Sequence, residues 1–175
     1  MNHVYLVGFM GSGKSTVGLF VAEKLGMPFI DLDARIETAA GMSVVEMFEA
    51  RGEEAFRAAE SAALESLAFE SPSVVACGGG IILHDANRRA LQKTGVVVYL
   101  RVGAEEAIAR IGDTSGRPLL ARGDAVTMAS TLLGAREALY RAVADVTVDT
   151  SGVAAHDVAA RVVECVSALL AERGA

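Results

Sequence analysis

The chain is poor in the residues that cross-link small secreted proteins or bind structural metals. Its 175 residues include two cysteines, Cys77 and Cys165, and three histidines that are scattered without the spacing of metal ligands. Two cysteines are too few for a disulfide framework or a cysteine-bound metal, and a reducing cytosol is their simplest context. We therefore expect a cytoplasmic protein that relies on a hydrophobic core.

Positive charge is also scarce. The chain has 16 Lys and Arg residues against 22 Asp and Glu residues, a net charge of −6. It therefore has no general cationic field with which to bind a nucleic-acid backbone. The apolar run at residues 4–10 lacks a basic flank and is too short for a signal peptide or a membrane span. We expect a monomer that has neither nucleic acid nor a membrane as a partner.

Apolar residues make up 52% of the chain, enough for one globular domain over residues 1–175. Helical patterns alternate with short apolar runs that are typical of buried strands, at residues 4–7, 29–32, 74–76, 96–100 and 146–148. This alternation predicts an α/β fold in which a parallel sheet carries helices on both faces. Between residues 43 and 69, the pattern predicts two helices broken near Arg51-Gly52.

Residues 8–15 satisfy the phosphate-loop pattern G-x-x-x-x-G-K-[ST], between an expected strand and an expected helix. Glycines let backbone N–H groups approach phosphate oxygens, and the helix N-terminus adds partial positive charge. Lys14 is expected to contact the β- and γ-phosphates and Ser15 to ligate Mg²⁺. The expected nucleotide-binding residues are Gly11, Ser12, Gly13, Lys14, Ser15 and Thr16. This loop alone does not separate a kinase from a GTPase or an ATPase.

Two carboxylates, Asp31 and Asp33, flank Leu32 at the end of the expected second strand. Strand alternation would point both to the same side of the sheet. Asp31 could then help to hold hydrated Mg²⁺, while Asp33 accepts a proton from an acceptor hydroxyl. The alternative is that Asp33 only caps the next helix.

Arg57 and Glu60 lie three residues apart on an expected helix and therefore share a face. Arg57 could form a forked contact with a substrate carboxylate while Glu60 holds the guanidinium in place. The alternative is an ordinary surface ion pair. Phe48 and Phe56 would supply an apolar wall beside them, or would simply pack in the core.

The glycine triplet Gly78, Gly79 and Gly80 follows the third expected strand, at the carboxyl edge where open parallel sheets bind ligands. Its bare N–H groups could face a substrate, whereas a tight turn would need only one glycine. Farther on, Arg117 follows a turn-rich stretch, where it could close over the phosphates or be an ordinary solvated arginine. Arg110 could stack on adenine.

These motifs occur together in one order, and the chain resembles the shikimate kinase family over essentially its whole length. The resemblance rests on residues 8–18, Asp31-Leu32-Asp33, Ile36-Glu37, Gly52-Glu53, Phe56-Arg57, Glu60, Gly78-Gly79-Gly80, Arg117-Pro118-Leu119-Leu120, Arg136 and Tyr140-Arg141. It implies a three-layer α/β/α P-loop fold with a five-stranded parallel sheet, a substrate-binding insertion at about residues 33–62 and a lid at about residues 112–124.

The resemblance also implies an activity, the transfer of the γ-phosphoryl group of ATP to the 3-hydroxyl of shikimate with Mg²⁺ as cofactor, in aromatic amino-acid biosynthesis. It implies that Asp33, Arg57, Gly79 and Arg136 hold shikimate, with Glu60 supporting Arg57. By the same resemblance, Asp31 assists Mg²⁺, Arg117 is the lid arginine and Arg110 borders the adenine. Helix patterning alone would not have selected Arg136.

Two other functions remain open at this level. A related P-loop kinase for another small hydroxylated metabolite, such as gluconate, would share the loop and differ only at the acceptor site. A nucleotide-binding regulatory module without turnover would not need an acceptor-side base, and the chain has one in Asp33.

Overall fold

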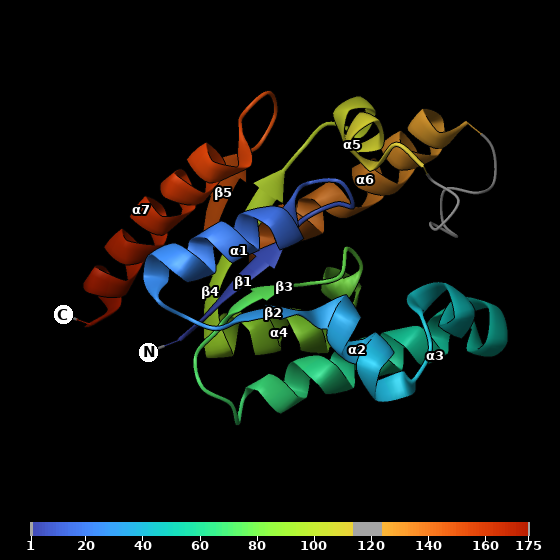
Figure 1. Cartoon of the computed structure of the whole chain (residues 1–175), viewed down its shortest axis with the longest axis horizontal. Helices are drawn as coiled ribbons and strands as arrows, with labels where there is room; N and C mark the ends of the chain where they lie inside the picture. Colours follow the sequence, from blue (N-terminus) through green and yellow to red (C-terminus); the bar gives the residue numbers. More distant parts are fainter. Residues whose placement is uncertain (1, 114–123, 175) are drawn as a thin grey trace.

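The computed structural model describes residues 2–113 and 124–174. Its five strands are β1 (His3–Val7), β2 (Phe29–Asp31), β3 (Val74–Ala76), β4 (Gly95–Arg101) and β5 (Val146–Asp149). They form one sheet in the order β2-β3-β1-β4-β5, and every pairing is parallel (Figure 1). The predicted parallel sheet and all five predicted strands are therefore confirmed.

Helices surround this sheet. They are α1 (Lys14–Leu25), α2 (Leu32–Ala40), α3 (Val44–Leu67), α4 (Asp85–Thr94), α5 (Ala104–Ile111), α6 (Ala125–Val143) and α7 (Ala155–Gly174), with a short 3₁₀ helix at Ile81–Leu83. The predicted break in the inserted pair lies at Gly52, where α3 has the non-helical angles φ 81° and ψ 169°. The helical insertion between β2 and β3 is thus built as the sequence predicts.

Strand β1 shows why the sheet needs helices on both faces. Val4 and Leu6 pack in one cluster with residues of α1 and α7, whereas Tyr5 and Val7 pack in a second cluster with residues of α3, α4 and α6. Successive side chains of a strand point to opposite faces, so an uninterrupted apolar run is the sequence of a strand buried on both sides. The result is the expected three-layer α/β/α arrangement.

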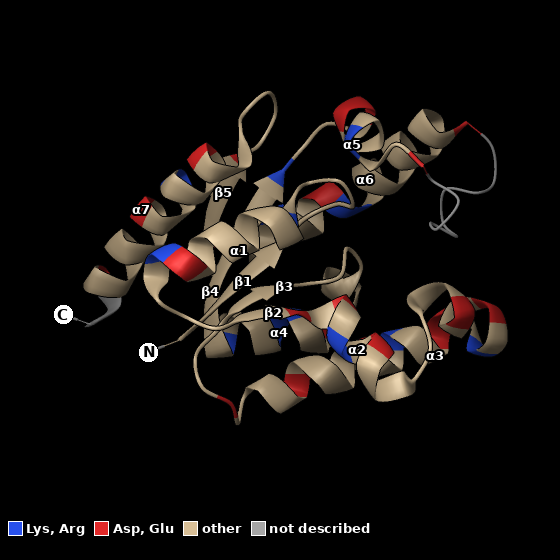
Figure 2. Cartoon of the chain, viewed as in Figure 1, with Lys and Arg blue, Asp and Glu red and all other residues tan. Residues whose placement is uncertain are grey.

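The strand order decides where the functional residues meet. β2, β3 and β1 are neighbours and run in parallel, so their carboxyl ends lie at one edge of the sheet. Asp31 ends β2, the glycine triplet follows β3, and the phosphate loop follows β1. Figure 2 shows few charged residues on the central strands and most of them on the surrounding helices. The charged residues at the carboxyl edge of the sheet are therefore exceptions to this distribution.

The predicted lid, at about residues 112–124, lies largely outside the described residues, and so does Arg117. Within the two described ranges, no helix combines the length and the apolar character needed to cross a bilayer.

Two helical glycines give opposite predictions for stability. Gly52 has a positive φ that a side chain rarely adopts, whereas Gly134 lies in α6 with open space where a Cβ would be added. We expect Gly52→Ala to lower the free energy of unfolding by about 1–2 kcal/mol and Gly134→Ala to raise it by about 0.5–1 kcal/mol. Urea unfolding of both variants checks this. Equal changes in the free energy of unfolding would contradict the kink at Gly52.

Candidate active site

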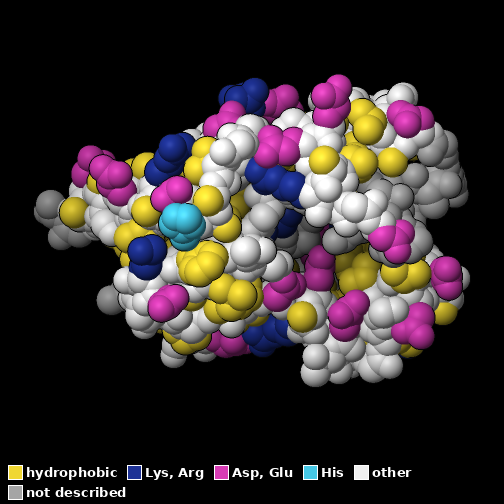
Figure 3. Space-filling view, turned by 45° about the horizontal axis from the view of Figure 1, so that its top comes forward, with side chains coloured by type: hydrophobic (Ala, Val, Ile, Leu, Met, Phe, Trp, Pro, Cys, Tyr) yellow, Lys and Arg dark blue, Asp and Glu magenta, His cyan; other side chains and the backbone are white. Residues whose placement is uncertain are grey.

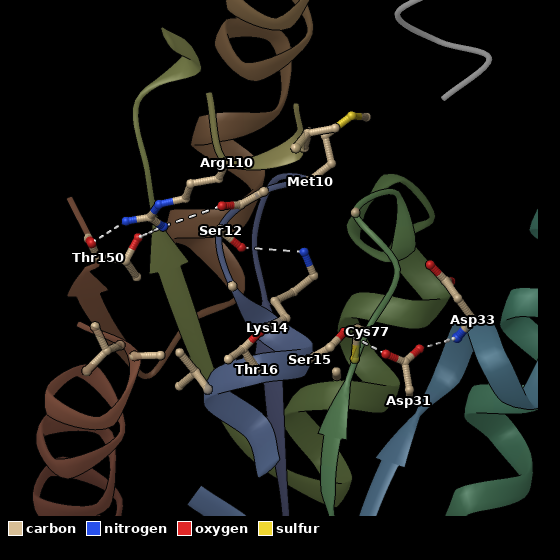
Figure 4. A pocket seen from close by; sticks show the side chains of 18 of the residues that line it. Met10, Ser12, Lys14, Ser15, Thr16, Asp31, Asp33, Cys77, Arg110 and Thr150 are labelled. Carbon is tan, nitrogen blue, oxygen red and sulfur yellow. Dashed lines mark hydrogen bonds between the residues drawn. The ribbon is translucent and has the colours of Figure 1, made fainter. Parts of the chain in front are cut away.

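A cavity of about 630 Å³ opens at the carboxyl edge of the sheet. Residues 10–17 of the phosphate loop and α1 form its floor, with further contributions from β2, β3, α5 and the segment after β5. The space-filling view shows this side of the molecule hollowed at its centre, with basic and acidic side chains at the walls (Figure 3). Arg110 and Thr150 lie at one side of the cavity and Asp31 and Asp33 at the other, with Lys14 between them (Figure 4).

The phosphate loop is shaped by glycine. Gly13 caps α1 with φ 88°, and Gly11 has φ 75° in a position where a Cβ would lie 2.5 Å from the carbonyl oxygen of Ala107. No side chain caps α1, and its first turn carries no acidic residue. The first N–H groups of the helix and its positive dipole end are therefore available to an anion.

Lys14 is held over this loop by the loop itself. Its Nζ donates to the carbonyl oxygens of Gly8 and Phe9, each at 2.9 Å, and lies 3.4 Å from Ser12 Oγ. The ammonium group is thus placed beside the helix N-terminus instead of extending into solvent. A phosphate bound there would meet a fixed cation as well as backbone N–H groups.

Ser15 and Asp31, the two predicted metal ligands, lie together in the cavity. The Ser15 hydroxyl donates to Asp31 Oδ2 at 2.6 Å (Figure 4). The other oxygen of Asp31 accepts from the backbone N–H groups of Asp33 and Ala34, at 3.1 and 3.3 Å, and so caps α2. One carboxylate therefore links the phosphate loop to the start of the inserted helices.

The predicted geometry of Asp33 is wrong in one respect. β2 ends at Asp31, and Leu32 already begins α2, so strand alternation does not aim the two carboxylates. The cap of that helix is Asp31 and not Asp33, because an aspartate oxygen satisfies the free N–H groups of the first turn. Asp33 nevertheless lines the same cavity, from the first helical turn.

Arg57 and Glu60 form a buried ion pair on α3. The Arg57 side chain is 9% exposed and that of Glu60 is 0% exposed, with 3.0 Å between Nη1 and Oε2. Glu53, to which the sequence analysis gave no role, accepts from Arg57 Nη2 at 3.0 Å. The guanidinium carbon lies 5.2 Å from the centre of the Phe56 ring, and Phe48 packs against Phe56. The alternative of a surface ion pair is therefore excluded.

Glu60 is more than a partner of Arg57. Burial raises the pKa of its carboxyl from the ordinary 4.5 to about 7, Arg57 and Arg136 oppose the rise, and Asp33 adds to it. Its Oε1 atom is buried and accepts no hydrogen bond from the described residues. Two arginines and two carboxylates thus act on one another in a poorly solvated space beside the cavity.

Close approach explains two glycines of the triplet, Gly78 and Gly80. None of the three has a positive φ, so no turn requires them. A Cβ on Gly78 would collide with Glu60 Oε1 and lie 2.8 Å from Asp33 Oδ1, and a Cβ on Gly80 would collide with the Arg57 guanidinium. A Cβ on Gly79 would meet ordinary contacts, 3.6 Å from the Gly8 carbonyl oxygen. The triplet therefore lets charged side chains lie directly against the backbone after β3.

Arg110 ties the phosphate loop to the segment after β5. Its Nη2 donates to the Thr150 carbonyl at 2.6 Å and to Glu106 at 2.7 Å, and its Nη1 donates to Thr150 Oγ1 at 2.9 Å. Thr150 lines the cavity but gave no signal in the sequence, because a lone threonine after a strand belongs to no motif. Arg110 thus places a planar guanidinium on the side of the cavity where the adenine is expected.

The structure brings nearly all of the predicted site residues to one place. Those that line the cavity are Gly11, Ser12, Gly13, Lys14, Ser15, Thr16, Asp31, Asp33, Gly79 and Arg110. Arg57 and Glu60 lie next to this group, against Gly80 and Gly78. Arg136 lies near enough to Glu60 for its charge to lower the pKa of that carboxyl. Arg117 lies outside the described residues.

Comparison with known proteins agrees with this geometry. A family model described as shikimate kinase matches residues 10–167. The chain belongs to the shikimate kinase family. The shikimate kinase of Halorhodospira halophila is 45% identical over 163 residues, which are 93% of this chain and 92% of that protein. A structure of the Acinetobacter baumannii shikimate kinase in complex with shikimate is 38% identical, with a TM-score of 0.93 over 96% of this chain and 94% of that one.

More distant kinases share the fold. The structure of a gluconokinase from Sinorhizobium meliloti covers 96% of this chain and 93% of its own, with a TM-score of 0.61 and 19% identity. At that identity the likeness is one of fold alone. It carries no argument for gluconate as the acceptor.

Gly80 and Gly79 form a matched pair for testing the close approach. We expect Gly80→Ala to lower the free energy of unfolding by about 2–3 kcal/mol, because its Cβ must displace the buried Arg57 guanidinium. Gly79→Ala should cost less than about 1 kcal/mol, since its Cβ enters ordinary contact. Urea unfolding of both variants measures the difference, and indistinguishable curves would contradict the packing.

The raised pKa of Glu60 predicts a pH dependence of stability. The folded chain binds this proton more tightly than the unfolded chain, so the contribution of Glu60 to the free energy of unfolding falls as pH rises from about 4.5 to about 7. Relative to Glu60→Gln, which does not titrate, the wild type should therefore lose stability between pH 5 and pH 8. Urea unfolding across this range checks the slope, with exposed Glu65→Gln as control. A constant difference would overturn the assignment.

Proposed function

We propose that the described cavity transfers the γ-phosphoryl group of ATP to the 3-hydroxyl of shikimate, giving shikimate 3-phosphate and ADP. As a member of its family, the chain is an ATP-dependent phosphotransferase with an alcohol acceptor. The observation that carries the choice of acceptor is the pair of buried arginines, Arg57 and Arg136, beside Asp33 and the phosphate loop. Such a pair suits a small acid that also carries hydroxyl groups.

The nucleotide is assigned to the phosphate loop. Its phosphates would lie against Lys14 and the N–H groups at the start of α1, and the adenine against Arg110. At the other end of the loop, the Ser15 hydroxyl and the Asp31 carboxylate supply hard oxygen donors 2.6 Å apart. The described residues contain no cluster of three or more His, Cys, Asp or Glu side chains that could hold a metal ion. Two donors fit Mg²⁺, which keeps most of its coordination for water and phosphates.

Ser15 and Asp31 would hold Mg²⁺, which would offset the negative charge of the phosphates. The protein's own contribution is to position the groups around it. Ser15 and Asp31 are already joined by a hydrogen bond, and Asp31 also fixes the backbone of Asp33. The metal side and the acceptor side are therefore set by the same carboxylate.

The acceptor is assigned to the opposite side of the cavity. The shikimate carboxylate would be held by the Arg57 and Arg136 guanidinium groups, which form forked, charge-assisted hydrogen bonds with such a group. Gly79 would donate its N–H to the substrate, and Gly78 and Gly80 would allow the close approach of the charged side chains. Asp33 would orient the 3-hydroxyl and accept its proton as the bond to phosphorus forms.

Transfer of the phosphoryl group then requires that the reactants are positioned and that the developing charge is stabilised. The 3-hydroxyl attacks the γ-phosphorus in line, and the bond to the β-phosphate oxygen breaks, so that ADP leaves. Lys14 stabilises the charge that develops on the transferred group. We assign the same task to Arg117, on the proposed lid, in line with the family resemblance.

The remaining assignments are simpler. A cytoplasmic location is supported by the use of ATP and by the free thiols Cys77 and Cys165. The monomer expected from the sequence stays a proposal. A net charge of −6 argues against nucleic acid as a partner.

The test of function is ADP release by the purified protein with ATP and Mg²⁺. Shikimate should stimulate release, whereas gluconate and nucleoside monophosphates should not. Stimulation by gluconate alone would replace the proposed acceptor. ATP binding without any stimulated release would favour a regulatory module.

Three substitutions separate the proposed roles. Lys14→Ala and Asp33→Ala should lower kcat by about 10²-fold or more, because they remove charge stabilisation and the base. Arg57→Ala should instead raise the KM for shikimate by about 10- to 100-fold, because the substrate carboxylate loses a charged partner. Steady-state kinetics with both substrates checks the split, and near-normal constants in folded variants would refute these roles.

A further inference from the structure

Tyr140 is a buried aromatic residue to which the mechanism above gives no task. It lies on α6, four residues after Arg136, so the two side chains share a face of that helix. It is 0% exposed, and its ring stacks on Tyr99 of β4 with 5.0 Å between ring centres and 12° between planes. By packing alone, Tyr140 would be an ordinary member of the core.

Its hydroxyl group is placed differently from the rest of the ring. It donates a hydrogen bond to the carbonyl oxygen of Gly79, the member of the triplet that lines the cavity. Burial raises the pKa of Tyr140, and the charge of the Arg136 guanidinium opposes that rise. A phenol has one donor and two acceptor positions. The hydroxyl therefore donates to Gly79, and the Arg136 guanidinium, on the same face of α6, is near enough to act on its pKa.

This hydroxyl bridges two parts of the site that are distant in sequence. The Gly79 carbonyl and the Gly80 N–H belong to one planar peptide unit, so fixing the carbonyl also fixes the orientation of that N–H. Gly80 in turn lies against the Arg57 guanidinium. Through one oxygen atom, Tyr140 thus ties α6, the helix that carries Arg136, to the triplet and, beyond it, to Arg57.

Tyr99 provides the contrast. Its ring is equally buried and forms the other half of the stack, but its hydroxyl oxygen has no hydrogen-bond partner among the described residues. The two tyrosines therefore share their packing and differ in what the hydroxyl does. Removing each oxygen in turn separates a packing role from a positioning role.

We propose that Tyr140 is a positioning residue for the acceptor, whose hydroxyl fixes the glycine triplet against α6, beside Arg136, in the arrangement that receives the acceptor carboxylate. This rests on the proposed function, because it takes a hydroxylated acid as the ligand of the two arginines. The hydroxyl itself touches neither substrate. Loss of the hydroxyl leaves the Gly79 carbonyl without this donor, so the substrate must order a triplet that was ordered before it bound.

The test compares Tyr140→Phe with Tyr99→Phe and the wild type. For Tyr140→Phe we expect the KM for shikimate to rise about 5- to 10-fold, while the KM for ATP and kcat stay within about twofold. Tyr99→Phe should leave all three constants within about twofold, because no hydrogen bond is lost. Isothermal titration of both variants with shikimate should repeat the difference as a change in Kd.

An unchanged KM and Kd for shikimate in Tyr140→Phe, or equal effects of the two variants, would assign Tyr140 to packing alone. A similar rise in the KM of both substrates would point to a general loosening of the fold and would also overturn the proposal. Failure of the wild type to respond to shikimate would refute the proposed function instead, so the two failures are distinguishable.

Discussion

The buried ion pair of Arg57 and Glu60 is the constraint around which the acceptor side is built. Removing two charges from water costs several kcal/mol for each ion, and the cost is recovered only where geometry and further partners are good. The structure supplies those partners in Glu53 and in the face of Phe56. Even so, one oxygen of Glu60 is left without a hydrogen bond from the described residues. A cluster that is only partly satisfied by its own protein is suited to a polar ligand.

The topology joins this cluster to the nucleotide site. β2, β3 and β1 are adjacent, so the residues that follow them meet at one edge although they are far apart in sequence. Asp31 is the link between the two halves, because one of its oxygens accepts from Ser15 and the other caps the helix that carries Asp33. Phosphoryl donor and acceptor can therefore be positioned by a few short contacts within a rigid frame.

Sequence reasoning succeeded where the signal is local. The phosphate loop and the five buried runs are contiguous patterns, and the structure has them where they were expected. It erred at Asp31 and Asp33 because the strand ends one residue earlier than its apolar run, and an aspartate at that point is a good helix cap. For the glycine triplet the sequence predicts bare N–H groups that face a substrate, and the structure adds a second reason at Gly78 and Gly80, which let charged side chains approach closely.

What sequence reasoning could not supply is the set of contacts made across the fold. Arg136 and Tyr140 come from α6, where nothing in the helix pattern distinguishes them from other buried residues, and only the resemblance to a family drew attention to Arg136. The contacts of Thr150 and Glu53 were not predicted for the same reason, because they depend on the neighbours that the fold brings to these residues. Local pattern predicts the frame, whereas the tertiary structure selects the side chains that face one another.

The central claim is that the buried charges are arranged to hold the carboxylate of a small acid. Isothermal titration with shikimate and with its methyl ester tests this most directly, because the two ligands differ at the carboxylate and share the three ring hydroxyls. We predict that the ester binds at least about 10²-fold more weakly, since it cannot form charge-assisted hydrogen bonds with Arg57 and Arg136. Equal affinities would contradict the account and would assign the two arginines to the stability of the fold.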